Sequence, residues 1–202
     1  MIPELNELAN LVSGFPGIGQ KSATRIAFHL LKQSDRYINN LIDTIAKFHK
    51  NMQFCPECGA LKNRELGCEL CSDARDHSIL CVVEQPSDAF TIEISGDYHG
   101  IYHVLMGCLS PLDGIGPNDI RLKELEARIR NKDIVKEIVV ATNPSLEGNA
   151  TANYIAEEFK NISGLKISRI AMGLAIGSQL EFSDSKIISQ SIKNRTLILE
   201  GN

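Results

Sequence analysis

Four cysteines near the start of the chain form two Cys-x2-Cys pairs separated by nine residues. They are Cys55, Cys58, Cys68 and Cys71. The surrounding segment, 54–76, is short and polar and has little that could build a hydrophobic core, so it needs a cross-link to fold. Each pair can present two thiolates to one tetrahedral ion, and Zn²⁺ favours such a closed set of four sulfur ligands. Iron fits the same ligands, and two disulfides are the alternative without a metal.

Composition favours the metal over the disulfides. The chain has 202 residues, of which 43% are hydrophobic and 23% charged, as in a soluble globular protein. It contains no apolar run of transmembrane length, and residues 1–7 lack the basic start and apolar run of a signal peptide. We therefore expect a cytoplasmic protein whose cysteines stay reduced unless a metal binds them. Cys81 and Cys108 lie outside the spacing of the two Cys-x2-Cys pairs. We expect Cys81 to be a core residue and Cys108 to be a loop thiol.

The formal net charge of −4 conceals an uneven distribution of charge along the chain. Residues 20–50 contain six basic and two acidic side chains, whereas residues 76–202 contain twelve basic and seventeen acidic ones. A polyanion responds to the local charge where it docks rather than to the net charge. We therefore expect any nucleic-acid contact in the N-terminal part, with an acidic body behind it.

Residues 1–53 have the pattern of a small helical domain. Apolar residues recur at helical spacing before and after a glycine-rich break at 14–19. The second helix is expected to start near Gln20, and a third amphipathic stripe begins near Arg36. The two helices around the break would form a tight hairpin.

That hairpin has the features of a phosphate-binding site. Gly17 and Gly19 permit positive φ and close backbone approach, and Ile18 between them can pack back into the helix pair. The following helix would present free N–H groups at its start, with Lys21 and Arg25 on one face beside them. The segment resembles the helix-hairpin-helix motif, which contacts phosphates without reading bases. An ordinary helical hairpin with a solvated basic face is the alternative.

Residues 77–172 alternate between strand and helix patterns, which predicts parallel β-α-β units in an α/β domain. The final segment, 173–202, predicts a helix followed by a strand. The expected strands are 79–83, 101–105, 137–142, 166–171 and 196–199, and the expected helices are 88–94, 121–130, 150–159 and 185–192. The fold class is therefore a multi-domain α/β protein with a helical start, a small cysteine module, a parallel-sheet domain and a short C-terminal segment.

The parallel-sheet region resembles the Toprim domain of topoisomerases, primases and nucleases. That domain holds Mg²⁺ with a glutamate after its first strand and an Asp-x-Asp pair after a later one. Here Glu84 matches the glutamate and Glu147 lies downstream, but the two Asp positions are Asn143 and Ser145. Mg²⁺ requires hard, charged oxygen ligands, so the loss of two carboxylates should weaken a catalytic site greatly. We therefore expect a binding platform rather than an enzyme.

Together these pieces closely resemble the RecR family of bacterial recombination mediator proteins, over nearly the whole chain. The string Leu-Ser-Pro-Leu-Asp-Gly-Ile-Gly-Pro at 109–117 is the most specific part of the resemblance. The other matching segments are 16–27, the four cysteines, 81–84, 141–152 and 168–173. The missing Asp pair is itself typical of that family, whereas the tail at 177–182 is a looser match.

The resemblance implies a non-catalytic scaffold that binds single- and double-stranded DNA without sequence specificity in recombinational DNA repair. Such proteins form dimers or ring-shaped tetramers and assist RecO, and sometimes RecF, in loading RecA on gapped or single-stranded DNA. Gly17, Gly19, Lys21 and Arg25 carry over as the DNA-binding hairpin, and the four cysteines as ligands of one Zn²⁺ per chain. Glu84, Asn143 and Glu147 would mark the face that meets RecO. The protein would act at the nucleoid within the cytoplasm.

Two other functions remain open from the residues alone. One is a Toprim-type Mg²⁺-dependent nuclease or primase, which would use Glu84, Glu147 and further carboxylates. The other is a zinc-finger DNA reader with sequence specificity. Four thiolates around one Zn²⁺ leave about −2 of charge, which argues against the cysteine module as the main DNA contact.

Overall fold

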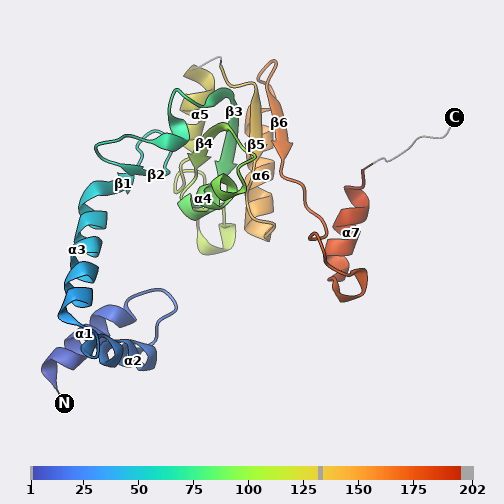
Figure 1. Cartoon of the computed structure of the whole chain (residues 1–202). Helices are drawn as coiled ribbons and strands as arrows, with labels where there is room; N and C mark the ends of the chain where they lie inside the picture. The colour runs from blue at the N-terminus through green and yellow to red at the C-terminus, as the bar shows by residue number, and fades with distance from the viewer. Residues whose placement is uncertain (1, 132–133, 197–202) are drawn as a thin grey trace. The chain divides into compact units, whose positions relative to one another are not determined.

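The computed structural model describes residues 2–131 and 134–196 of the chain (Figure 1). Two compact units are present, Met1–Met52 and Gln53–Asn202. The finer division at 53, 76 and 172 stays a prediction. No helix in the described part of the chain is long and apolar enough to cross a membrane.

The first unit begins with the predicted helical hairpin. Its helices are α1 (Pro3–Ser13) and α2 (Gln20–Leu31), joined by the glycine-rich turn. The small residues Ala9, Val12 and Ala23 are buried where the helices meet, because their short side chains let the two backbones approach. Ile18 packs against this cluster from the turn, as expected from its place between two glycines.

Helix α3 (Asp35–Asn51) follows and differs from a core helix. The Ser34 hydroxyl caps its start by accepting a hydrogen bond from the Tyr37 N–H at 3.3 Å. Its sequence has the predicted apolar stripe, yet none of its residues is buried. Ile42, Ile45 and Phe48 on that stripe are exposed.

The second unit is built on a parallel four-stranded sheet in the order β4-β3-β5-β6, which Figure 1 shows side by side. The strands are β3 (Asp76–Val83), β4 (Gly100–Val104), β5 (Glu137–Val140) and β6 (Lys166–Arg169). The connecting helices are α4 (Pro86–Ser95), α5 (Leu122–Asn131) and α6 (Leu146–Phe159). The predicted parallel α/β domain is therefore confirmed.

Both faces of the sheet are covered, and alternation along β3 separates the two cores. Leu80 and Val82 point into a cluster with residues of α5 and α6, including Leu125 and Ile155. Cys81 and Val83 point to the other face. There they join a second buried cluster with residues of β4, with Ala89 of α4 and with two of the four module cysteines, Cys55 and Cys58. Cys81 is thus the core residue that the sequence predicted.

The cysteine module is docked on edge strand β4. It contains a two-stranded sheet, β1 (Met52–Phe54) with β2 (Leu61–Asn63). The Val104 N–H donates to the Cys58 carbonyl at 2.7 Å, which extends the edge of the large sheet into the module. Arg121, just before α5, donates to the Pro56 carbonyl at 2.7 Å. The module therefore belongs to the second core and not to a separate one.

His103 is a structural residue of β4. It is fully buried and its Nε2 lies 2.8 Å from the Arg121 carbonyl. Burial lowers the pKa of His103 to about 3 because the apolar surroundings disfavour the charged ring. The neutral ring therefore donates a hydrogen bond and ties β4 to the start of α5.

The C-terminal segment contains the predicted helix as α7 (Ser185–Lys193), whose start is capped by Asp184 through the Lys186 N–H at 2.7 Å. The strand predicted at 196–199 lies almost entirely outside the described residues. Two helices are longer than predicted at their starts: α4 begins at Pro86, and α6 begins at Leu146, because Ser145 caps it. The sequence prediction placed these starts too late because it relied on the spacing of apolar residues, and the capping residues do not belong to that pattern.

Docking of the module can be tested with two glycines that both adopt a left-handed conformation, Gly59 at φ +77° and Gly67 at φ +90°. An added Cβ would lie 2.8 Å from the Val104 carbonyl oxygen at Gly59 and meets nothing within 4 Å at Gly67. Gly67→Ala is expected to reduce the free energy of unfolding by about 1–2 kcal/mol through backbone strain. Gly59→Ala should remove about a further 1–3 kcal/mol through the clash. Equal losses in chemical denaturation would show that the module does not pack tightly on β4.

Candidate metal centre and DNA-binding hairpin

The four predicted cysteine ligands converge on one point. Their sulfur atoms all lie within 4.8 Å of one another, with Cys55 and Cys58 buried and Cys68 and Cys71 half-buried. Two of the sulfur pairs are close: Cys55 Sγ lies 3.8 Å from Cys71 Sγ, and Cys58 Sγ lies 3.4 Å from Cys68 Sγ. Sulfurs bound to one tetrahedral Zn²⁺ at about 2.3 Å would be about 3.8 Å apart. The cluster therefore has the size of a four-sulfur metal site.

Electrostatics within the cluster call for a cation. The pKa of Cys58 is raised to about 12, chiefly by its hydrogen bond with Cys68. The pKa of Cys71 is also raised, chiefly by its hydrogen bond with Cys58, whereas Cys68, which accepts from the other sulfurs, has its pKa lowered to about 2. Four sulfurs this close share protons because they cannot all carry charge. A divalent ion would remove that conflict by binding all four as thiolates.

The hairpin places its free N–H groups at an open surface. Gly19 is the N-cap of α2 and provides no side-chain cap, so the first N–H groups of that helix keep their hydrogen-bonding capacity. Gly17 has φ +77°, which explains the glycine there, whereas Gly19 has an extended conformation and open space where a Cβ would stand. That open space leaves room for a ligand to approach the backbone.

Two cations flank this helix start. Lys21 and Arg25 are exposed, and neither forms an ion pair within the part of the chain that the structure describes. Both lie on α2, four residues apart, and so share one face of it. A phosphate at the start of α2 would meet backbone N–H groups, the positive end of the helix dipole and both side chains.

The remaining predicted residues meet at the carboxyl end of the parallel sheet. Glu84 follows β3 and is only 6% exposed. Its Oε1 accepts the Asn143 backbone N–H at 2.8 Å and its Oε2 accepts the Asn143 side-chain amide at 2.7 Å. The structure thus brings Glu84 and Asn143 together, and both oxygens of the buried carboxylate already have a donor.

The loop after β5 is held tightly over this pair. The Ser145 hydroxyl caps α6 by accepting from the Gly148 N–H at 2.9 Å, and the Thr142 hydroxyl donates to the Gly148 carbonyl at 2.8 Å. A Cβ on Gly148 would lie 2.1 Å from the Asn143 carbonyl oxygen and 2.6 Å from Glu84 Oε1. Asn143 itself is exposed and Glu147 is half-buried, so both are accessible from outside. Gly148 was not predicted as a part of this site, because its close approach to Glu84 joins residues that are distant in the sequence.

The nearby Cys108 is not distinguished as a site. Burial raises the pKa of its thiol, and the carboxylates of Glu84, Glu147 and Asp113 raise it further. A thiol of this kind is less reactive than a free one at neutral pH. This agrees with the loop thiol that the sequence predicted.

Comparison with known proteins decides the family. The helix-hairpin-helix family of RecR matches residues 5–49, and the Toprim domain family matches residues 78–171. The recombination protein RecR of Lactobacillus johnsonii is 40% identical over 193 residues, covering 94% of this chain and 96% of that protein. The corresponding proteins of Nocardia farcinica and Mycobacterium tuberculosis are each 41% identical over 195 and 198 residues, with at least 95% of this chain covered. This chain belongs to the RecR family. The helix-hairpin-helix, the Toprim domain and a cysteine cluster that fits zinc are therefore established features of this RecR chain.

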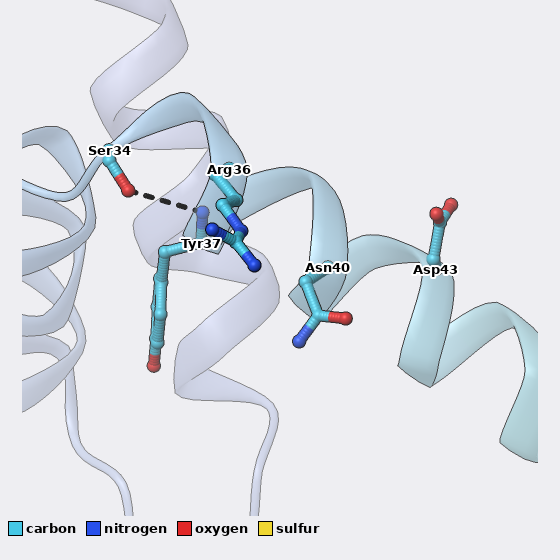
Figure 2. Close-up of a pocket in the computed structure, with 5 residues that line it drawn as sticks. All are labelled: Ser34, Arg36, Tyr37, Asn40 and Asp43. Atoms are coloured by element: carbon cyan, nitrogen blue, oxygen red, sulfur yellow. Dashed lines mark hydrogen bonds between the residues drawn. The ribbon is translucent and has the colours of Figure 1, made fainter.

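Sequence reasoning missed a group of polar residues at the start of α3. Figure 2 shows five side chains that line a shallow depression there. They are Ser34, Arg36, Tyr37, Asn40 and Asp43. The apolar stripe of the same helix dominated its pattern, and Arg36 was counted only as a part of the basic region. The sequence signal that could have identified this group is the aromatic Tyr37 next to the cation Arg36, just after the capping residue Ser34.

The Glu84–Asn143 pair predicts which of two variants of Asn143 has the lower free energy of unfolding. Asn143→Ala removes one hydrogen bond to Glu84, whereas Asn143→Asp places a second carboxylate against it. We expect Asn143→Asp to be the less stable by about 1–3 kcal/mol, although it is closer in shape to asparagine.

Thermal unfolding at neutral pH measures the difference between the two variants. An aspartate variant more stable than the alanine variant would contradict the assignment of Glu84 as a carboxylate that needs an amide donor.

Proposed function

We propose that this RecR chain is a non-catalytic, sequence-nonspecific DNA-binding scaffold of recombinational repair. It assists RecO, and in some settings RecF, in loading RecA on gapped or single-stranded DNA at the nucleoid. The observation that most supports DNA binding is the uncapped start of α2, with Lys21 and Arg25 exposed beside it. These groups contact phosphates, which every DNA sequence presents alike.

The Glu84–Asn143 pair supports a scaffold rather than a nuclease or primase. A Mg²⁺ site at this edge would need several free carboxylate oxygens. Glu84 is the carboxylate that the Toprim pattern supplies, and both its oxygens accept hydrogen bonds from Asn143. Two neutral N–H donors of Asn143 stabilise the buried charge where a metal ion would otherwise do so. The partner face is then formed by Asn143 and Glu147, with Glu84 holding the loop from beneath.

The four cysteines would hold one structural Zn²⁺. The cluster fits a tetrahedral ion, and four protein ligands leave no open position for a substrate or water. Zinc would supply cross-linking of the module and no chemistry. Because the module packs on β4, metal binding would also stabilise that edge of the Toprim sheet.

A homo-oligomer is the working unit in this proposal. One hairpin reaches about two phosphates, which gives a salt slope of about −2 and weak binding. Several hairpins on one assembly would add their contacts through effective concentration. The exposed apolar stripe of α3 is consistent with contacts between chains.

Loss of a zinc ligand should release the metal and destabilise the second unit. We expect Cys58→Ser to reduce bound zinc from one equivalent per chain to well below one, because structural zinc binding is coupled to folding. Elemental analysis and thermal unfolding measure the two effects. Cys108→Ser, which changes a cysteine outside the cluster, should retain the zinc. Iron in place of zinc, or a native fold with no metal, would contradict the assignment.

DNA binding should depend on the hairpin cations. The double change Lys21→Ala with Arg25→Ala should weaken binding equally for unrelated sequences and flatten the salt dependence by about 0.9 per lost duplex phosphate contact. Fluorescence anisotropy over a range of salt concentrations measures both. Lys186→Ala with Lys193→Ala removes the same charge from exposed positions of α7 and is the matched control.

An unchanged affinity in the hairpin variant would place the DNA contact elsewhere. Mg²⁺-dependent cleavage of a labelled oligonucleotide by the unaltered protein, lost in Glu84→Ala, would instead favour the nuclease alternative. Strong discrimination between unrelated sequences would favour a zinc-finger reader.

A further inference from the structure

The depression at the start of α3 has the chemistry of a nucleotide contact. Arg36, Asn40 and Asp43 are spaced four and three residues apart and so lie along one face of the helix. Tyr37 borders this face. Figure 2 shows Arg36, Tyr37 and Asn40 extending to the same side, whereas the carboxylate of Asp43 points away from them.

The aromatic ring is held in place but not covered. The Ser34 cap fixes the backbone of Tyr37 through the hydrogen bond at 3.3 Å. Tyr37 is 48% exposed as a residue and is therefore accessible from solvent. An exposed ring on a capped first turn loses little conformational freedom when a ligand stacks on it.

The cation next to the ring is available. Arg36 is exposed and makes no hydrogen bond or ion pair within residues 2–131 and 134–196. Asn40 offers an amide that can both donate and accept. An open ring, a free guanidinium and an amide together match a nucleobase that carries its own phosphate.

We propose that Tyr37, Arg36 and Asn40 form a contact for one unstacked nucleobase of single-stranded DNA, which rests on the DNA-binding function proposed above. Tyr37 stacks on the base, Asn40 bonds to its edge and Arg36 pairs with the adjoining phosphate. Every base has a face that can stack, so the contact is tolerant of sequence. In duplex DNA the faces of the bases are covered by their neighbours, so the contact selects single strands. The hairpin of α2 contacts phosphates of either form.

The face that carries these residues favours DNA over a second copy of the chain. The apolar residues Ile42 and Ile45 lie on a different face of α3 from Arg36 and Asn40 and suit a protein contact, whereas Phe48 lies three turns beyond Tyr37 on the same side. The proposed site instead presents a cation and an amide, which an apolar surface would leave without partners.

The test compares Tyr37→Leu with Phe48→Leu in the full, zinc-loaded chain. Both changes replace an exposed aromatic ring of α3 by the same aliphatic side chain, and the two positions lie about 16 Å apart along the helix axis. Binding to oligo-dT and to a duplex of equal length is measured by anisotropy, and the assembly state by sedimentation. We expect Tyr37→Leu to weaken oligo-dT binding about five- to tenfold and to leave duplex binding unchanged. Tyr37→Phe retains the ring and should bind oligo-dT normally. Phe48→Leu should also bind oligo-dT normally, measured at protein concentrations where its assembly state matches that of the unaltered chain.

Arg36→Ala provides an independent readout. It should reduce the salt slope for oligo-dT by about 0.7, the value for one phosphate contact on a single strand. Normal oligo-dT binding by Tyr37→Leu would overturn the proposal. Equal loss for both DNA forms with a changed sedimentation coefficient would also overturn it, and would assign Tyr37 to an interface between chains. If the unaltered protein bound neither DNA form, the proposed DNA-binding function itself would fail, whatever the variants did.

Discussion

Burial of both faces of β3 is the constraint on which the second unit depends. Leu80 and Val82 require cover from α5 and α6, and Cys81 and Val83 require cover on the opposite side. Part of that second cover is the cysteine module, including Cys55 and Cys58. A segment too small to have its own core thus completes the core of the sheet. Metal binding by the four cysteines would therefore be coupled to folding of the Toprim domain.

The same strand also sets the character of the site at the sheet edge. It delivers Glu84 to the carboxyl end, where parallel strands usually place ligand-binding groups. Burial of that carboxylate demands a counter-charge or hydrogen-bond donors. Asn143 provides the donors through its backbone and its side chain. The glutamate of the Toprim scaffold therefore holds the loop after β5 through Asn143, which is exposed.

In the first unit the polar and apolar features are divided between different helices. The hairpin of α1 and α2 has a small buried core and an open helix start with two cations. Helix α3 has no buried residue and carries an apolar stripe on one face and Arg36 and Asn40 on another, with Tyr37 at the border between them. This division lets one small unit serve both DNA and contacts between chains in the function we propose.

The sequence alone determined the elements whose chemistry is local: the cysteine spacing, the hairpin glycines and cations, the parallel sheet and the missing Asp pair. Local spacing specifies these because ligand geometry and apolar periodicity act over a few residues. Tertiary structure decided that the module packs on β4, that Glu84 is buried against Asn143, and that the α3 stripe stays exposed. Glu84 and Asn143 are 59 residues apart in sequence. No local pattern reports such a pair, because burial and partner choice arise only when distant strands meet in the sheet.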